Sequence, residues 1–218
     1  RFIIEEGCGM VKKSQRADRK SAEKAMRIGK AAAKLFSRKG FLETTMDEIA
    51  AAAKISKGGM YYYFPSKTEV LFFVLSTYMD LVLEDLEQSL SQIEDSGDKL
   101  KFVISRHIEL YSKNLHQAKV LLHDAHCLPA KYFSSIAEKE REYYQIVVGI
   151  LKELARDSIP KAQLTAITFT LFGMCNWIYS WYDPKGTVTP RELSEIIHDI
   201  FLTGFNEFKM TQSRRLAG

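Results

Sequence analysis

Apolar side chains recur at helical spacing along almost the whole chain, and this pattern limits the folds open to it. Between Ser21 and Lys39, for example, apolar or small residues recur at intervals of three and four positions. This is the period of one face of an α-helix. No clear run of alternating polar and apolar residues, the pattern of a half-buried β-strand, is present. The sequence therefore predicts an all-α protein.

Capping residues and helix breakers divide the chain into about nine helices. Thr45 and Glu48 have the spacing of a capping box, and so do Ser66 and Glu69. Pro65 is expected to end the preceding helix, because proline disfavours helical backbone at the residue before it. The predicted helices cover residues 21–39, 45–53, 57–63, 67–92, 98–117, 119–126, 130–156, 160–182 and 190–208.

The charges of the chain are unevenly distributed. Residues 1–67 hold 15 of the 31 Lys and Arg residues but only 7 of the 27 Asp and Glu residues. The N-terminal third is therefore basic, whereas the remainder is acidic. Such an asymmetry indicates that one end of the protein meets a polyanion. A solvated basic tail is the alternative explanation.

Cysteine usage and hydropathy indicate a cytoplasmic location. The three cysteines (Cys8, Cys127 and Cys175) lack metal-ligand spacing, and their odd number argues against a disulfide framework. No apolar run approaches the roughly 20 residues of a membrane-spanning helix. The nine residues before Met10 lack the long apolar stretch of a signal peptide.

The stretch KISKGGMYYYFPSK (54–67) has an unusual composition for a segment between two helices. Glycines weaken helices, and consecutive tyrosines favour strands. A short helix here, after the helix at 45–53, would complete a helix-turn-helix. The second helix of that motif lies in the DNA major groove. Glycines would let its backbone come close to DNA, and tyrosine hydroxyls can donate hydrogen bonds to phosphates.

The segment TTMDEIAAAAKISKGGMYYYFPSKTEVL (44–71) resembles the DNA-binding signature of the tetracycline-repressor (TetR) family of transcription regulators. The matching features are a threonine pair, an Ile-Ala pair, an Ile-Ser turn, a Lys-Gly start to the recognition helix, Tyr-x-x-Phe, and a Ser-Lys-x-x-Leu-like opening of the next helix. Lys54 departs from the pattern, because the family commonly has glycine there. A lysine can adopt that backbone conformation only with some strain.

This resemblance covers residues 20–72 and implies a division of the chain. We expect a flexible leader or basic arm at 1–19, a helix-turn-helix DNA-binding domain at 20–66, and a ligand-binding and dimerisation domain at 67–218. Tyr61 and Phe64 are expected to pack inside the DNA-binding domain. The residues that the resemblance implies at the DNA are Thr45, Lys57, Gly58, Gly59, Tyr62, Tyr63 and Lys67.

The apolar helices near the C-terminus predict a homodimer. The run LFGMCNWIYSWY (171–182) is apolar almost all round, so it needs partners on more than one side. Two such helices from each subunit can form a four-helix bundle across a twofold axis, as the resemblance also implies. The dimer would present two recognition helices one DNA turn apart to a palindromic site. Burial within the same subunit is the alternative for the last helix. The predicted interface residues are Trp181, Ile197, Ile200, Phe201 and Phe205.

Aromatic and aliphatic residues of the middle helices are suited to line a ligand cavity, although for each residue taken alone a packed core is the better explanation. The segment FGMCNWIYSWYDPKG (172–186) resembles family members that respond to fatty-acyl thioesters. An anionic head group would then meet Lys131, Arg141 or Arg106, each of which is otherwise a solvated charge. The predicted ligand-binding residues are Phe102, His107, Tyr111, Tyr143, Phe172, Met174 and Trp177.

These features together predict a bacterial transcriptional repressor that leaves a palindromic operator when a small hydrophobic effector, such as a fatty-acyl thioester, binds. The alternative is an architectural or cell-cycle DNA-binding protein with no small-molecule effector. The sequence contains no glycine-rich phosphate loop or nucleophile elbow, which argues against an enzyme. His123, His126 and Cys127 lack a fourth zinc ligand at suitable spacing. We therefore expect no metal and no cofactor.

Overall fold

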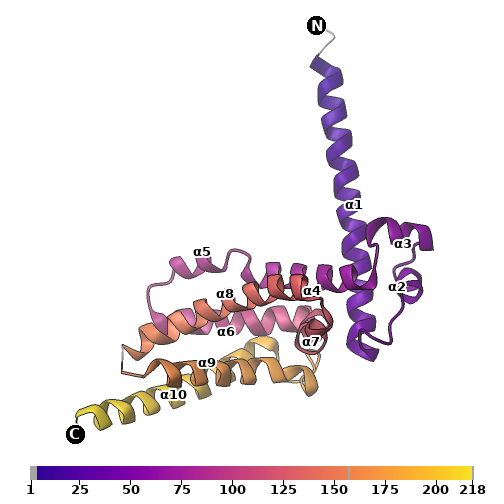
Figure 1. Ribbon diagram of the computed structural model, residues 1–218. Coiled ribbons are helices and arrows are strands. Elements are labelled where there is room, and N and C mark those ends of the chain that lie inside the picture. Colours follow the sequence, from indigo (N-terminus) through magenta and orange to yellow (C-terminus); the bar gives the residue numbers. More distant parts are fainter. Residues whose placement is uncertain (1–3, 157, 218) are drawn as a thin grey trace. The chain divides into compact units, whose positions relative to one another are not determined.

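The computed structural model describes residues 4–156 and 158–217, and the side chains of residues 19–156 and 158–212. Within these ranges the chain forms ten α-helices and two short 3₁₀ helices, and no strand (Figure 1). The predicted all-α fold is confirmed. The chain divides into two compact units. An N-terminal unit contains the chain up to Ser76 together with Lys119–Phe133, and a C-terminal unit contains Thr77–Ala118 and the chain from Ser134 onward.

The N-terminal unit is built on three helices that follow one another closely. These are α1 (Ile4–Lys39), α2 (Met46–Ala52) and α3 (Lys57–Tyr63), with α2 packed against both of the others (Figure 1). The unit also contains the first part of α4 (Lys67–Leu83), most of α7 (Leu115–Asp124), and the 3₁₀ helix η1 (Ala125–Cys127). Its fully buried side chains include Ile28, Ala32, Ala33, Phe36, Ile49, Met60, Val70 and Leu71.

Helix α1 begins upstream of the position that the sequence predicted. We expected a start at Ser21, after a flexible leader or arm at 1–19, but the helix is continuous from Ile4 to Lys39. Its packing depends on Gly29, because a Cβ at this position would lie 2.9 Å from the ring of Phe73 on α4. A side chain at this point would therefore require the Phe73 ring or one of the two helices to shift.

Local capping explains why α2 and α3 start where the sequence predicted. The Thr45 hydroxyl accepts a hydrogen bond from the Glu48 backbone N–H at 3.3 Å, and the Glu48 carboxylate accepts one from the Thr45 N–H at 2.8 Å. This pair is a complete capping box. The Ser56 hydroxyl caps α3 by accepting from the Gly59 N–H at 3.1 Å. Each bond satisfies an N–H that the helix itself leaves without a partner.

The turn between α2 and α3 contains the strained lysine that the resemblance indicated. Lys54 has a φ of 53°, in the left-handed region, where a side chain beyond Cβ is unfavourable. Gly40, which follows α1, has a φ of 86° and bears no such penalty. The family's usual glycine at the position of Lys54 is thus explained by backbone geometry.

The C-terminal unit is a bundle of long helices. It contains the end of α4, then α5 (Leu86–Ser91), α6 (Ser96–Lys113) and the start of α7. It continues with most of α8 (Ala130–Ala155), α9 (Lys161–Asn176), the 3₁₀ helix η2 (Trp177–Ser180) and α10 (Pro190–Ala217). Helix α6 packs against α9 and α10, which also contact each other (Figure 1). None of the helices in the described part of the chain is both long and apolar enough to cross a lipid bilayer.

The expected single helix over 67–92 is wrong, because the chain breaks between α4 and α5. Asp85 adopts a left-handed φ of 51° at the break. The Arg106 side chain, on α6, donates hydrogen bonds through Nη2 to the carbonyl oxygens of Leu81 (3.1 Å) and Glu84 (2.5 Å). These bonds satisfy carbonyls that the end of α4 exposes. A cap supplied by such a distant residue leaves no local signal in the sequence.

Candidate nucleic-acid interface and interior cavity

Helix α3 turns one face to the core of the N-terminal unit and the other to solvent. Met60 is fully buried, and the side chain of Phe64, directly after the helix, is 7% exposed. The Phe64 ring packs against that of Phe73, with the centroids 5.1 Å apart. On the outer face Tyr62 is 81% exposed, and Lys57 and Gly58 are exposed as well. The predicted outward presentation of the recognition helix agrees with this geometry.

Two tyrosines next to Tyr62 differ in their surroundings. Tyr61 is 45% exposed, so the expectation that it packs inside is wrong; the expectation for Phe64 is confirmed. Tyr63 is half-buried, and its ring meets that of Tyr62 edge-on at 5.2 Å. This contact restricts the orientation of the exposed Tyr62 ring.

The two glycines of α3 play different parts. A Cβ at Gly58 would meet nothing within 4 Å, so the fold itself does not require glycine there. A Cβ at Gly59 would lie 3.1 Å from the Ser56 hydroxyl that caps the helix. Gly58 therefore leaves an open approach to the backbone at the N-terminus of α3, where N–H groups are suited to phosphate oxygens.

Lys57 is the cation at the start of α3. Its ammonium lies 3.1 Å from the carboxylate of Asp47 on α2, and both side chains are largely exposed. The hydrogen bond to Asp47 and the opposite charge raise the pKa of Lys57. Because exposed ion pairs contribute little to stability, Lys57 can exchange this partner for a phosphate.

Thr45 and Lys67 are already engaged in the fold. The Thr45 hydroxyl donates to the Glu48 carboxylate at 2.9 Å, and Lys39 also binds this carboxylate. The Lys39 ammonium, followed by the two Thr45 hydrogen bonds, lowers the pKa of Glu48 to about 2. Lys67 donates to the carbonyl oxygens of Phe41 (2.7 Å) and Leu42 (2.9 Å). Its ammonium also lies 4.5 Å from the centre of the Phe41 ring, so Lys67 supports the loop between α1 and α2.

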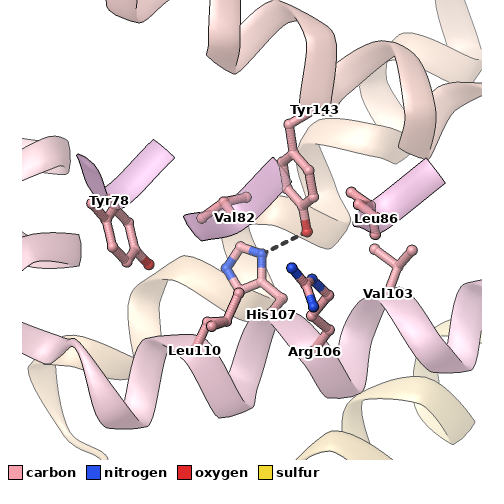
Figure 2. Close-up of a pocket in the computed structure, with 8 residues that line it drawn as sticks. All are labelled: Tyr78, Val82, Leu86, Val103, Arg106, His107, Leu110 and Tyr143. Carbon is pink, nitrogen blue, oxygen red and sulfur yellow. Dashed lines mark hydrogen bonds between the residues drawn. The ribbon is translucent and has the colours of Figure 1, made fainter. Parts of the chain in front are cut away.

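The C-terminal unit encloses a small cavity between α4, α5, α6 and α8. Figure 2 shows the Arg106 guanidinium and the His107 ring next to each other below the Tyr143 hydroxyl. The cavity volume is about 20 Å³, which is room for about one water molecule. The residues that line it are Tyr78, Val82, Leu86, Val103, Arg106, His107, Leu110 and Tyr143.

His107 links three helices through hydrogen bonds. Its Nδ1 lies 3.0 Å from the Tyr143 hydroxyl, and its Nε2 lies 3.0 Å from Oδ1 of Asn176. Because Asn176 Oδ1 can only accept, Nε2 carries the proton and Nδ1 accepts from Tyr143. Burial lowers the pKa of His107 to about 4, although the Asn176 hydrogen bond opposes this shift. The ring is therefore neutral near pH 7. Burial also raises the pKa of Tyr143.

Four of the seven predicted ligand-binding residues lie together. The ring of His107 stacks on that of Tyr111 at 6.2 Å and meets that of Tyr143 at 5.9 Å. The ring of Tyr143 in turn stacks on that of Phe172 at 5.6 Å. These contacts form an aromatic wall beside the cavity.

The other three predicted ligand-binding residues lie elsewhere. Phe102 is half-buried on α6 and does not line the cavity. Met174 lines a separate groove between α9 and α10. Trp177 is 63% exposed. The structure thus places these three residues away from this cavity. Helical spacing could not show this for Met174 and Trp177, because the run 171–182 is apolar almost all round.

The three predicted cations lie in different surroundings. Lys131 and Arg141 are exposed on α8, whereas Arg106 lines the cavity.

Sequence reasoning missed Tyr78 and Asn176. Asn176 had a signal, since it is an amide within the apolar run 171–182.

The five predicted interface residues divide into two groups. Ile197, Phe201 and Phe205 are buried within this chain, where α10 packs on α6 and α9. Burial in the same subunit, the alternative explanation, therefore holds for these three. Trp181 and Ile200 are 61% and 62% exposed. Other exposed apolar residues of α9, η2 and α10 are Phe169, Trp177, Ile196, Phe208 and Met210.

The candidate zinc ligands near η1 form no closed site. The Cys127 sulfur lies 3.5 Å from Nε2 of His126. Over the described residues, however, no three His, Cys, Asp or Glu side chains are arranged to hold a metal ion.

Comparison with known families and structures agrees with this geometry. The family described as "Bacterial regulatory proteins, tetR family" matches residues 28–73, and the family "Tetracyclin repressor-like, C-terminal domain" matches residues 94–205. The chain is 25% identical over 177 residues to the HTH-type transcriptional repressor KstR2 of Rhodococcus jostii (strain RHA1), an alignment that covers 79% of this chain and 86% of KstR2.

Solved structures share the fold over most of the chain. A TetR-family transcriptional regulator from Bordetella parapertussis 12822 has a TM-score of 0.79 and 31% identity, over 82% of this chain and 93% of that chain. AibR, solved in complex with isovaleryl coenzyme A and operator DNA, has a TM-score of 0.72 and 24% identity, over 81% of this chain and 97% of AibR. At 24% identity the likeness to AibR concerns the fold alone.

The match to the C-terminal family spans more than half of the chain, and the N-terminal match covers the helix-turn-helix. The resemblance of residues 44–71 to the DNA-binding signature is thereby confirmed, and the family is one of regulators and not of enzymes. The chain belongs to the TetR family of bacterial DNA-binding transcriptional regulators.

Proposed function

We propose that this protein is a homodimeric, cytoplasmic repressor that holds a palindromic operator and releases it when a hydrophobic acyl effector binds its C-terminal unit. The DNA-binding part of this proposal rests on the orientation of α3. Met60 anchors the helix in the core, while Tyr62, Lys57 and the open backbone at Gly58 face outward. In this proposal Lys57 and Tyr62 contact DNA phosphates, and Gly58 permits close approach.

Four other DNA-contact assignments remain predictions of the resemblance. Thr45 and Lys67 would meet phosphates at the starts of α2 and α4, and Gly59 and Tyr63 would flank the main contacts. Two N–H groups of the Lys67 ammonium bind the carbonyls of Phe41 and Leu42. The third N–H would bind the phosphate. The strongest assignments are therefore Lys57, Gly58 and Tyr62.

Dimerisation is supported by the exposed apolar side chains of α9 and α10. Phe169, Ile196 and Ile200 are 61%, 49% and 62% exposed, and Ile200 also lines an apolar groove between the two helices. Exposed apolar residues grouped in this way indicate a protein interface. A second copy of the chain is the partner that would also supply the second half-site contact of a palindrome.

The effector is proposed to bind at the cavity below Tyr143. The aromatic wall of His107, Tyr143 and Phe172 suits an apolar ligand, and AibR provides a precedent, since its structure contains isovaleryl coenzyme A. A cavity of about 20 Å³ is too small for an acyl chain. The ligand must therefore stabilise a more open conformation, and only its differential affinity for the two states can drive release. A hundredfold loss of DNA affinity requires about 2.7 kcal/mol of such coupling.

Fluorescence anisotropy and footprinting on the DNA upstream of the protein's own gene test this function. We expect protection of one palindromic site, and release when a coenzyme A thioester is added at a concentration at which free coenzyme A has no effect. Protection of no specific sequence would contradict the repressor proposal as a whole. Specific protection that no acyl compound reverses would contradict its effector part.

The closed cavity favours one second candidate, an architectural or cell-cycle DNA-binding protein without an effector. In that case the side chains around His107 are simply a packed core. Many genomic binding sites, all insensitive to acyl compounds, would distinguish this candidate from a ligand-released repressor.

A further inference from the structure

The guanidinium of Arg106 belongs to two structural features at once. Its Nη2 holds the carbonyl oxygens of Leu81 and Glu84 at the end of α4. The same side chain forms part of the wall of the cavity, next to His107 and Tyr143 (Figure 2). Arg106 therefore connects the interior of the cavity with the point where α4 stops.

One N–H of this guanidinium has no acceptor. Nε of Arg106 is buried, and no acceptor among the described residues reaches it. The recorded bonds of the side chain go to backbone carbonyls, and no ion pair with a carboxylate is found in the described part of the chain. A buried donor without an acceptor, on a side chain whose charge is also unpaired, is unfavourable. The cavity wall thus contains an unused donor on a cationic side chain that has no carboxylate partner among the described residues.

The neighbouring polar groups do not satisfy this donor. The Tyr143 hydroxyl donates its proton to His107, and Nε2 of His107 donates to Asn176. Each of these groups already has its own partner across the helices. The Tyr78 hydroxyl also lines the cavity, but among the nitrogen atoms of the described cavity wall the Nε of Arg106 is the buried donor that has no acceptor.

We propose that Arg106 recognises the acyl carbonyl or carboxylate oxygen of the effector and transmits its binding to the end of α4. This inference rests on the proposed function and deepens it by naming the recognising residue and the recognised atom. The ligand oxygen accepts from Nε–H, while Nη2 keeps the carbonyls of Leu81 and Glu84. The guanidinium would then bind the ligand on one side and the end of α4 on the other. Because its donors form one rigid plane, it would fix the end of α4 relative to the ligand.

Helix α4 is a suitable element to receive this signal. It begins at Lys67, directly after the recognition helix and Pro65, and ends at the residues that Arg106 caps. Residues 67–76 of this helix belong to the N-terminal unit, and residues 77–83 to the C-terminal unit. A change at its capped end is therefore covalently continuous with the DNA-binding unit.

Two ligands that differ by one oxygen test the proposal directly. Palmitoyl coenzyme A carries the thioester carbonyl, whereas S-hexadecyl coenzyme A is the thioether that lacks it; palmitate tests a carboxylate. We expect the wild-type full-length protein to bind palmitoyl coenzyme A or palmitate at least tenfold more tightly than the thioether, as measured by calorimetry. In R106K and R106Q this preference should fall to about one, because neither side chain places an N–H donor where the guanidinium Nε of Arg106 lies.

R141K is the matched control, since Arg141 is an exposed arginine of the same unit. It should keep the full preference for the carbonyl ligand. Each preference is a ratio within one variant, so a moderate loss of stability does not affect it. Circular dichroism melting confirms that each variant is folded.

Amide hydrogen exchange tests the connection to α4. We expect the carbonyl ligand to slow exchange at least threefold in residues 81–90 of the wild-type protein and of R141K, but not of R106K. Unchanged ligand preference in R106K, together with normal release of the operator, would overturn this inference and leave the proposed function intact. Binding of no acyl probe to the wild-type protein would overturn both the ligand contact and the effector part of the proposed function.

Discussion

Met60 and Tyr62 lie two positions apart on α3, and their exposures are 0% and 81%. This contrast fixes the rotation of the helix, because residues two positions apart lie on nearly opposite faces. It is also the structural basis for assigning α3 to DNA. A buried Tyr62 would have left its hydroxyl out of reach of a DNA phosphate.

Replacing Gly58 with alanine should separate stability from DNA binding. Since a Cβ at this position meets nothing within 4 Å, the substitution should stabilise the protein by up to about 1 kcal/mol through helix propensity. Operator affinity should nevertheless fall, because the methyl group occupies the space needed by DNA. Urea unfolding and fluorescence anisotropy measure the two effects. Gly149→Ala on α8, also at an open position, should change only stability, and an equal loss of DNA affinity there would contradict the assignment.

Replacing Lys57 with alanine should weaken binding to all DNA sequences alike. One phosphate contact fewer reduces the slope of log affinity against log salt concentration by about one. The melting temperature should remain almost unchanged, because the pair with Asp47 is exposed. Anisotropy titrations at several salt concentrations provide the slope. A loss confined to the operator sequence would instead indicate that Lys57 reads bases.

Replacing Lys67 with alanine should destabilise the fold. The carbonyl oxygens of Phe41 and Leu42 would lose their shared donor, which costs about 1–3 kcal/mol. Urea unfolding of the variant measures this loss. If stability is unchanged while affinity for all DNA falls, Lys67 acts on phosphates and not on the loop.

Protonation of His107 should destabilise the C-terminal unit. Its pKa is about 4 in the folded protein and about 6.5 when unfolded. The unfolded state therefore binds more protons between these values, and stability should fall as the pH is lowered from about 6.5 to about 4. Nuclear magnetic resonance titration of the imidazole measures the folded pKa. A value near 6.5 would show that the ring is hydrated and that burial does not keep it neutral.

Replacing Ile200 with glutamate should dissociate the dimer. This residue is 62% exposed in the single chain, so the substitution leaves the subunit core intact but puts a charge in the proposed interface. Analytical ultracentrifugation should detect monomers and a loss of cooperative operator binding. Leu42→Glu, at an apolar residue of the N-terminal unit that is 74% exposed, is the matched control and should remain dimeric. Dimers of the Ile200 variant would exclude this face of α10.

Local signals explain how much of the fold could be predicted. The capping box of Thr45 and Glu48 and the Ser56 cap lie within four residues of the groups they satisfy, so the starts of α2 and α3 could be read from the sequence. The break at Asp85 could not, because its stabilising cap comes from Arg106 on another helix. Apolar spacing likewise could not show which part of α10 is buried, since the exposed Ile196 and Ile200 lie directly beside the buried Ile197 and Phe201 in one broad apolar face.

The candidate sites also differ in how far the sequence could predict them. The recognition helix was predictable because its chemistry lies in one continuous segment, 54–67. The cavity was predictable only in part, because His107 and Asn176 meet from positions 69 residues apart. The orphan Nε of Arg106 depends on the absence of an acceptor in three dimensions. The spacing of residues in the sequence cannot show that a buried donor lacks an acceptor.

A hydroxyl-radical footprint of the wild-type protein on its own upstream DNA tests the central claim most directly. Two recognition helices of a dimer should protect two symmetric half-sites with centres about 34–36 Å apart, or a multiple of one DNA turn. Gly58→Leu should abolish both protected regions together. Protection of a single half-site, or a footprint that survives a leucine at the exposed start of α3, would contradict a paired presentation of this helix to the major groove.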